Sequence, residues 1–276
     1  MDVIIRLIVS ALRTVPGIDA VVLGGSHATG HATKDSDLDI GVYYGLIQPL
    51  DWAALNHVVQ MIDDDHRAHL VSDPGGWGPW VNAGAWLRIN GQPVDIILRD
   101  TTRVIHVISA CKNGEIEAHY HPGHPHAFIN VMYMGELSVC NVLWDATHEI
   151  ASLKRQVESY SDAVQQGIYR AFRFEAQFST HLAIKNIHRH DAYYVTAHLV
   201  RAISALNQIL FALNRHYCLN EKQAVSRAGL FEKTPHQDHQ RVDALLADVW
   251  QNPAQACADM QDLIDEVEQL IHREGS

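Results

Sequence analysis

The chain has 276 residues, 47% of them apolar, and it carries 21 basic against 32 acidic residues, a formal net charge of −11. This length and apolar content allow one large hydrophobic core or two smaller ones, and two is the prior expectation. The negative charge disfavours proteins that follow a long nucleic-acid backbone, because such proteins need a basic surface.

The cysteines and the N-terminal segment indicate a reduced, non-membrane setting. The four cysteines show no paired metal-ligand or redox spacing, and they are Cys111, Cys140, Cys218 and Cys257. We expect buried thiols of a cytoplasmic protein. The first residues contain charges and an apolar stripe through Ile4, Ile8 and Leu12, which predicts an amphipathic helix and not a signal peptide or membrane span.

The first half of the chain alternates helical and strand patterns. We expect a helix near 2–14, strands near 18–25 and 37–44, a helix near 51–65, strands near 80–98 and a helix near 101–113. This order predicts an α/β (α+β) domain at 1–134, in which helices pack on a small mixed sheet.

From Gly135 onward strand signals fade and long helical periods begin. Helices are expected near 162–189 and 191–217. Two more should start at Thr234-Pro235 and Asn252-Pro253, where the first residue can cap the helix and proline suits its first turn. This pattern predicts an all-α helical bundle domain at 135–276.

A glycine-rich turn follows the first predicted strand. Gly24 and Gly25 allow the backbone to approach a ligand closely, and Ser26 opens a helical turn whose unpaired N–H groups can bind a phosphate. We therefore predict that Gly25 and Ser26 bind a phosphorylated ligand.

Two carboxylates lie on the next predicted strand. Side chains alternate along a strand, so Asp37 and Asp39 share one face, opposite Leu38 and Ile40. Two adjacent carboxylates repel each other unless a cation lies between them. Mg²⁺ suits the pair because it binds a few carboxylates together with substrate phosphate oxygens. The alternative is a surface turn in which Asp35 and Asp37 only cap the entry to the strand.

Asp95 is the third carboxylate candidate. It follows a two-residue turn predicted at Asn90-Gly91 and points away from the buried face of its strand. With Asp37 and Asp39 it could hold two metal ions. The alternative is a strand-end charge that pairs with Arg88 or Arg99.

The order and spacing of these motifs resemble the nucleotidyltransferase (polymerase-beta-like) superfamily. In that superfamily an apolar strand ends in Gly-Ser, Asp-x-Asp lies on the next strand and a third acid on a later one. The motif resemblance covers about residues 20–98. The two-part plan is similar to the antibiotic nucleotidyltransferases and their bacterial relatives, and beyond residue 98 this likeness is only architectural.

The resemblance implies a Mg²⁺-dependent enzyme that moves a nucleoside monophosphate to a hydroxyl of a small, aminoglycoside-like molecule and releases pyrophosphate. ATP is expected as the co-substrate only because the family commonly uses it, and another nucleoside triphosphate is the alternative. The implied metal ligands are Asp37, Asp39 and Asp95, with two Mg²⁺ ions. Ser26 would anchor the triphosphate, and Lys34 could reach it or could be an ordinary solvated lysine.

Two glutamates are candidates for the general base that the helical domain of this family often supplies. Glu175 interrupts an apolar helix stripe, and burial there would raise its pKa. A salt bridge to Arg170, to Arg173 or to a neighbouring helix is the alternative. Glu136 lies at the expected domain junction, where an acceptor could bind, or it complements a helix dipole as a first-turn acid.

Two further segments have more than one reading. Residues 119–126 contain four histidines, but the spacing matches no tetrahedral zinc site, and Pro122 and Pro125 predict an extended loop. This loop could bind a metal, line the acceptor pocket or serve as a connector. Trp77 and Trp80 could stack on a base or sugar, or pack in the core.

Two other functions compete with the leading one. The first is a toxin-like nucleotidyltransferase that modifies tRNA or a protein hydroxyl, which the acidic charge disfavours for RNA. The second is a non-catalytic toxin–antitoxin interaction module, which three intact carboxylates disfavour. The expected partners are a nucleoside triphosphate and a small-molecule acceptor, and the bundle could also form a homodimer.

Overall fold

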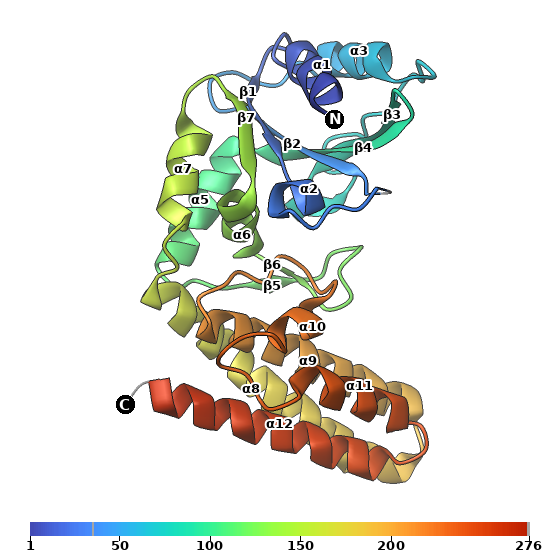
Figure 1. Ribbon diagram of the computed structural model, residues 1–276, viewed down its shortest axis with the longest axis vertical. Coiled ribbons are helices and arrows are strands. Elements are labelled where there is room, and N and C mark those ends of the chain that lie inside the picture. Colours follow the sequence, from blue (N-terminus) through green and yellow to red (C-terminus); the bar gives the residue numbers. More distant parts are fainter. Residues whose placement is uncertain (35, 275–276) are drawn as a thin grey trace. The chain divides into compact units, whose positions relative to one another are not determined.

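The computed structural model describes residues 1–34 and 36–274 (Figure 1). The chain divides into two compact units, and neither is a single stretch of sequence. The first comprises residues 1–109 and 133–159, and the second comprises residues 110–132 and the chain from 160 onward.

The first unit is built on a mixed sheet. Its strands are β1 (Ile18–Leu23), β2 (Leu38–Tyr44), β3 (Ala83–Ile89), β4 (Gln92–Asp100) and β7 (Asn141–Asp145). Its helices are α1 (Asp2–Leu12), α2 (Gly25–Thr29), α3 (Trp52–Ile62), α4 (Gly78–Val81), α5 (Thr101–Lys112), α6 (Met132–Val139) and α7 (Glu149–Val157); α5 and α6 extend past the boundary of the unit. The sheet order is β3-β4-β2-β1-β7, with β2 and β4 parallel and the other neighbours antiparallel. The predicted mixed sheet is confirmed.

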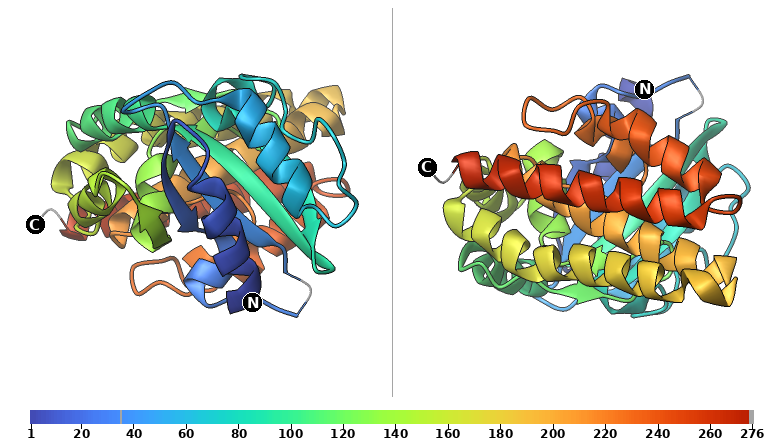
Figure 2. Two further views of the ribbon diagram at one scale, coloured as in Figure 1. Left: turned by 90° about the horizontal axis from the view of Figure 1, so that it is seen from above. Right: turned by 90° about the horizontal axis from the view of Figure 1, so that it is seen from below.

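One face of this sheet forms the core of the first unit. Strand alternation places Leu38, Ile40 and Val42 on this face, where they are buried. Helices α1 and α3 cross the same face (Figure 2) and bury their apolar stripes in the core. The carboxylate of Asp51 accepts from Ala54 N at 2.9 Å, which caps the start of α3.

The opposite face of β2 and β4 carries polar residues and is covered at one end by α6. The guanidinium of Arg99, on β4, is buried and donates to both oxygens of Glu136, at 2.7 and 3.1 Å. The other end of this face carries Asp39 and Asp95.

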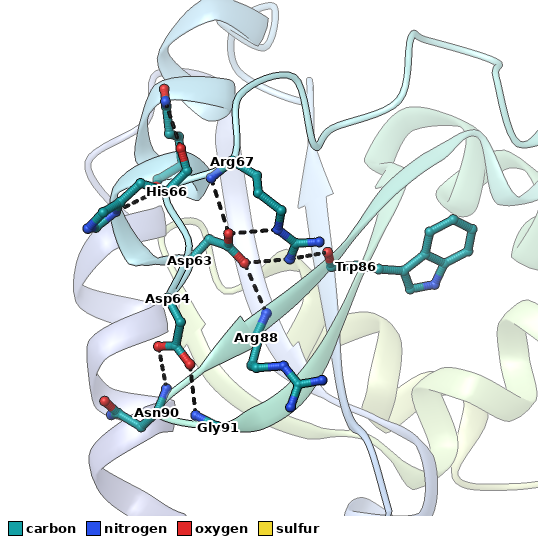
Figure 3. Close-up of polar contacts among 9 residues, drawn as sticks. Asp63, Asp64, His66, Arg67, Trp86, Arg88, Asn90 and Gly91 are labelled. Atoms are coloured by element: carbon teal, nitrogen blue, oxygen red, sulfur yellow. Dashed lines mark hydrogen bonds and ion pairs between the residues drawn. The ribbon is translucent and has the colours of Figure 1, made fainter.

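A polar cluster after α3 fixes the β3–β4 hairpin (Figure 3). The buried carboxylate of Asp63 accepts from the Arg67 guanidinium at 2.6 and 2.9 Å and from Arg88 N at 3.0 Å. Asp64 accepts from Asn90 N at 2.7 Å and Gly91 N at 2.8 Å. These bonds hold the predicted two-residue turn against the end of α3.

The second unit consists mainly of long helices. They are α8 (Asp162–Asn186), α9 (Ala192–Leu213), α10 (Ala224–Ala228), α11 (Asp238–Asp248) and α12 (Pro253–Glu274), with the 3-10 turn η1 (Ile187–Arg189) and the short strand pair β5 (Ala118–His119) and β6 (Phe128–Ile129). Helices α8, α9 and α12 pack together (Figure 2). The predicted helical bundle is confirmed.

Two details differ from the sequence expectations. Helix α11 begins at Asp238, because Thr234 and Pro235 lie in a preceding turn where the Pro235 carbonyl accepts from Asp238 N at 3.2 Å. Helix α12 does begin at Pro253. Strand β7 was not predicted, since it is short and only half-buried, yet it pairs with β1. The expected domain limits, 1–134 and 135–276, stay a prediction.

Helix α9 is long and apolar enough to cross a membrane, and 72% of its apolar window is buried inside the protein. Such burial is typical of the core helix of a soluble protein, and the α8–α9 packing accounts for it.

We expect Asp63→Ala to lower the free energy of unfolding by about 2–4 kcal/mol, because Arg88 N loses a buried acceptor and Arg67 loses its partner. Urea denaturation at pH 7 measures this. The hydrogen bond from Arg67 lowers the pKa of Asp63 and outweighs the effect of burial. The contribution is therefore present at neutral pH and is lost as the pH falls below about 4.

Asp64→Ala is the matched control, because the Asp64 side chain is exposed and its two bonds can be replaced by water. A loss under about 1 kcal/mol is expected for it. Equal losses in the two variants would show that Asp63 has no special role.

Candidate functional site

The sheet register brings two of the predicted metal ligands together. On the parallel strands β2 and β4, Asp39 lies directly opposite Asp95, and both side chains are half-buried on the polar face of the sheet. Asp37 directly precedes β2 and is exposed.

The ionisation of Asp95 reflects this crowding. Burial, followed by the negative charges of Asp39 and Asp37, raises the pKa of Asp95 to about 6. The alternative pairing of Asp95 with Arg99 is not what forms, because Arg99 binds Glu136 and donates to the Val81 carbonyl. Asp95 thus belongs to a group of carboxylates of like charge.

The glycine turn packs against the same carboxylates. Gly24 N donates to the Asp39 carbonyl at 2.9 Å, and Gly25 begins α2 with a φ of +55°. A Cβ added at Gly25 would lie 1.7 Å from Asp39 Oδ2. Only glycine therefore allows this turn to approach Asp39 so closely. Ser26, the next residue, is half-buried in α2.

The loop that leads into β2 is tied to the β3–β4 hairpin. Ser36 Oγ accepts from Thr33 N at 2.8 Å, and Gln92 Nε2 donates to the Ser36 carbonyl at 2.9 Å. Lys34 lies in this loop and is exposed, so its contact with phosphates stays a prediction. The capping role considered for Asp35 lies outside the described residues.

Glu136 is occupied by a structural partner. Both of its carboxylate oxygens accept from Arg99 in a fork-to-fork arrangement. Glu136 was expected in the first turn of a helix, but α6 begins at Met132 and Glu136 lies in its middle. A role for Glu136 as a general base stays a prediction.

Glu175 belongs to an ion-pair cluster in the second unit. His126 Nε2 lies 3.0 Å and Arg201 Nε lies 2.5 Å from Glu175 Oε1. Burial raises the pKa of Glu175, but the hydrogen bond from His126 and the charge of Arg201 outweigh burial and hold that pKa below its ordinary value. The expected raised pKa is therefore wrong, although a role for Glu175 as a base stays a prediction.

The salt-bridge alternative for Glu175 is realised by Arg201 on the neighbouring helix α9, and not by Arg170 or Arg173. Arg170 donates to the Gly114 carbonyl, and Arg173 pairs with Glu268. These contacts leave His126 and Arg201 as the pair that binds Glu175.

The histidine-rich loop is anchored to the helices of the second unit. His124 Nδ1 lies 3.0 Å from Glu221, which also accepts from His126 N, while the His126 ring binds Glu175. Within residues 1–34 and 36–274, no group of three or more His, Cys, Asp or Glu side chains is arranged around a metal position. These contacts anchor the loop, and its role as acceptor-pocket lining or as a connector stays a prediction.

The tryptophans have different surroundings. Trp80 is buried, and its ring packs near Tyr133 and beneath the Arg103 guanidinium. Trp77 stacks on Trp86 with ring centroids 4.6 Å apart. Sequence reasoning missed Trp86, although the two-residue turn at Asn90-Gly91 gave the signal, because it pairs position 86 with position 95.

Asp39 and Asp95 offer the oxygen ligands that a hard divalent cation prefers, although with Asp37 they do not form a three-residue metal group within the described residues. Oxygen ligands suit Mg²⁺, which retains waters and takes part of its coordination from substrate phosphates, so a complete protein cage is not needed. Asp39 and Asp95 are adjacent, and Asp37 is near enough to affect the ionisation of Asp95. A cation between these groups would relieve their repulsion.

We predict that Asp95→Asn raises the melting temperature at pH 8 in the absence of metal and leaves it unchanged at pH 4. The folded chain binds the Asp95 proton up to about pH 6, whereas the unfolded chain releases it near pH 4. Ionised Asp95 therefore destabilises the fold as the pH rises through this range, and asparagine removes that effect. Thermal denaturation across pH 4–8 measures the difference.

Asp238→Asn provides a control in the second unit, where burial raises the pKa of Asp238 to about 6. It should show the same pH trend but keep the wild-type stabilisation by Mg²⁺ and a nucleotide analogue, which Asp95→Asn should reduce. A lower melting temperature for Asp95→Asn at pH 8 without metal would contradict this account.

Gly25→Ala should reduce nucleotide binding at least tenfold, because the new methyl group collides with the Asp39 carboxylate. Gly45→Ala is the control, since Gly45 also has a positive φ, of +89°, but has open space around the added Cβ. Both variants should lose about 1–2 kcal/mol of stability from backbone strain. Equal nucleotide affinity in the two, measured by calorimetric titration with Mg²⁺, would refute the role given to Gly25.

Comparison with known proteins finds a family match near the start of the chain. Residues 5–53 match the nucleotidyltransferase domain family, a match that includes Gly25, Asp37 and Asp39 but ends before Asp95. A nucleotidyltransferase-like protein from Exiguobacterium sibiricum 255-15 aligns with a TM-score of 0.47 and 11% identity, over 98% of this chain and 73% of that chain. The search of curated proteins finds no match. The superfamily predicted from the motifs is confirmed for this part of the chain: residues 5–53 match a nucleotidyltransferase domain.

Proposed function

We propose that this nucleotidyltransferase moves a nucleoside monophosphate, AMP from ATP, to a hydroxyl of a small molecule and releases pyrophosphate. The observation that carries the proposal is the pairing of Asp39 with Asp95, with the Gly25 turn packed against Asp39. Nucleotidyltransferase domains use a nucleoside triphosphate and a divalent metal. The choice of ATP, of Mg²⁺ and of a small acceptor belongs to the proposal.

Different residues of the polar face would bind the phosphates and the metal ions. The turn at Gly25 and Ser26 holds the β- and γ-phosphates, with Lys34 available to approach them from the loop. Asp37, Asp39 and Asp95 would hold two Mg²⁺ ions. When bound, these ions neutralise the charge that develops on the phosphate oxygens.

The sheet order gives the reaction a direction. Across the polar face the order is the Gly25 turn, Asp39 on β2 and then Asp95 on β4. In-line displacement places the attacking and leaving oxygens on opposite sides of the phosphorus. Pyrophosphate therefore leaves toward Gly25 and Ser26, and the acceptor hydroxyl enters from the side of Asp95.

Asp95 is the chain's own proton acceptor in this scheme. The acceptor oxygen bonds to the α-phosphorus, the bond between that phosphorus and the bridging oxygen to the β-phosphate breaks, and the hydroxyl proton moves to the Asp95 carboxylate. Of the three carboxylates, Asp95 lies on the side from which the acceptor enters in this scheme. Glu136 and Glu175 are not needed in this scheme, because Arg99, and His126 with Arg201, bind them.

Small acceptors fit the charge of the chain better than RNA does. With a net charge of −11, the protein would repel a long phosphate backbone. The four cysteines are buried free thiols, which fits a reducing cytoplasm.

We expect Asp39→Asn to lower the rate of transfer at least 100-fold, because it removes a charge from the centre of the carboxylate group. The assay follows label from each α-labelled nucleoside triphosphate, with Mg²⁺, into separate pools of small metabolites, RNA and protein. Asp243→Asn, an exposed acid of α11, is the control and should keep wild-type activity.

Label in the small-metabolite pool that disappears in Asp39→Asn would support the proposal. Transfer into RNA or protein alone would replace the small acceptor with a macromolecule. Transfer that persists in Asp39→Asn would refute the role given to the carboxylates.

A further inference from the structure

Trp86 lies next to the carboxylates on the side opposite the glycine turn. It faces Asp95 directly across the β3–β4 hairpin, just as Asp95 faces Asp39 across β4 and β2. Opposed side chains of antiparallel strands have Cβ atoms about 4.5–5.5 Å apart. The polar face therefore runs from the Gly25 turn through Asp39 and Asp95 to Trp86.

The Trp86 indole is exposed and supported from one side. It is 63% exposed, and its ring stacks on Trp77 at 4.6 Å with an interplanar angle of 29°. Trp77 itself lies over Gly84, where an added Cβ would be only 2.1 Å from the Trp77 ring. We call Trp77 and Trp86 the aromatic platform.

The backbone beneath the platform is fixed in place. Arg67 Nη2 donates to the Trp86 carbonyl at 3.3 Å. Asp63 accepts from Arg67 and also from the backbone N–H of Arg88, two residues after Trp86. Figure 3 shows the Trp86 indole pointing away from this polar cluster. An exposed aromatic ring held in one orientation is preorganised for stacking and gives up little entropy on binding.

The direction of the reaction decides what this ring meets. Pyrophosphate leaves toward the Gly25 turn, so the region beyond Asp95 receives the acceptor. A hydroxyl within reach of Asp95 places the rest of the acceptor molecule over Trp86. Aromatic side chains bind flat rings by stacking, and this contact needs only a ring face and no particular substituents on the ring.

We propose that the aromatic platform is the acceptor subsite, and that Trp86 stacks on the ring of a small cyclic acceptor whose hydroxyl is presented to Asp95. This assignment rests on the proposed function. It adds that the acceptor carries a ring next to the modified hydroxyl, and that Trp86 determines which acceptors are used. The competing occupant is the base of the nucleoside triphosphate.

The test separates acceptor binding from nucleotide binding in Trp86→Ala. The acceptor probe is a small-molecule cell extract freed of macromolecules by ultrafiltration, titrated by volume with α-labelled ATP and Mg²⁺, and ATP is titrated separately at saturating extract. We expect Trp86→Ala to raise the half-saturating amount of extract at least tenfold and to change half-saturation by ATP less than twofold. Trp86→Phe should restore acceptor binding to within threefold, because a stacking ring remains.

Trp250→Ala is the matched control. Trp250 is 77% exposed and lies in the second unit, so its loss should change neither titration. Melting temperatures of all the variants show whether the fold is kept.

Three results would overturn the assignment. Half-saturation by ATP could rise in Trp86→Ala, which would assign the platform to the nucleotide base. A second such result is that Trp86→Ala changes neither titration, which would leave the platform without a role in binding. A third is that the wild-type chain labels only RNA or protein. Binding of Mg²⁺ and α,β-methylene-ATP by the wild-type chain, measured in parallel, distinguishes these results from failure of the proposed function, in which no nucleotide would bind.

Discussion

The parallel pairing of β2 with β4 is the constraint on which the site depends. It sets Asp39 beside Asp95, although the two carboxylates repel each other and burial disfavours their charges. The same two strands bury Leu38, Ile40, Val94 and Ile96 on their other face. Strand alternation therefore couples the two faces, so the hydrophobic core stabilises a register that places the carboxylates together.

Other contacts hold the neighbours of this pair in position. Gly25 lets the turn after β1 approach Asp39 without a collision. On the other side, the Asp63–Arg67 pair fixes β3 and so the position of Trp86. Phosphate binding, metal binding and acceptor binding can thus be arranged across one sheet face in the order of its strands. No group from the second unit is needed for this chemistry.

Local patterns predicted most of the first unit and part of the site. Alternation placed Asp39 on the polar face, and the Asn90-Gly91 turn fixed the hairpin that carries Asp95. Contacts between segments that are distant in the sequence could not be predicted from such local patterns. The pairing of Glu175 with His126 and Arg201 depends on helix and loop packing, and the stacking of Trp77 on Trp86 depends on the path of an irregular loop.

The most direct test of the paired carboxylates is a crystal structure grown with Mn²⁺ and α,β-methylene-ATP, because anomalous scattering locates manganese independently of the protein. We expect manganese bound to Asp39 and Asp95, with the triphosphate against Gly25 and Ser26. Manganese bound elsewhere, such as at the loop of residues 119–126, with no nucleotide beside Asp39, would contradict it.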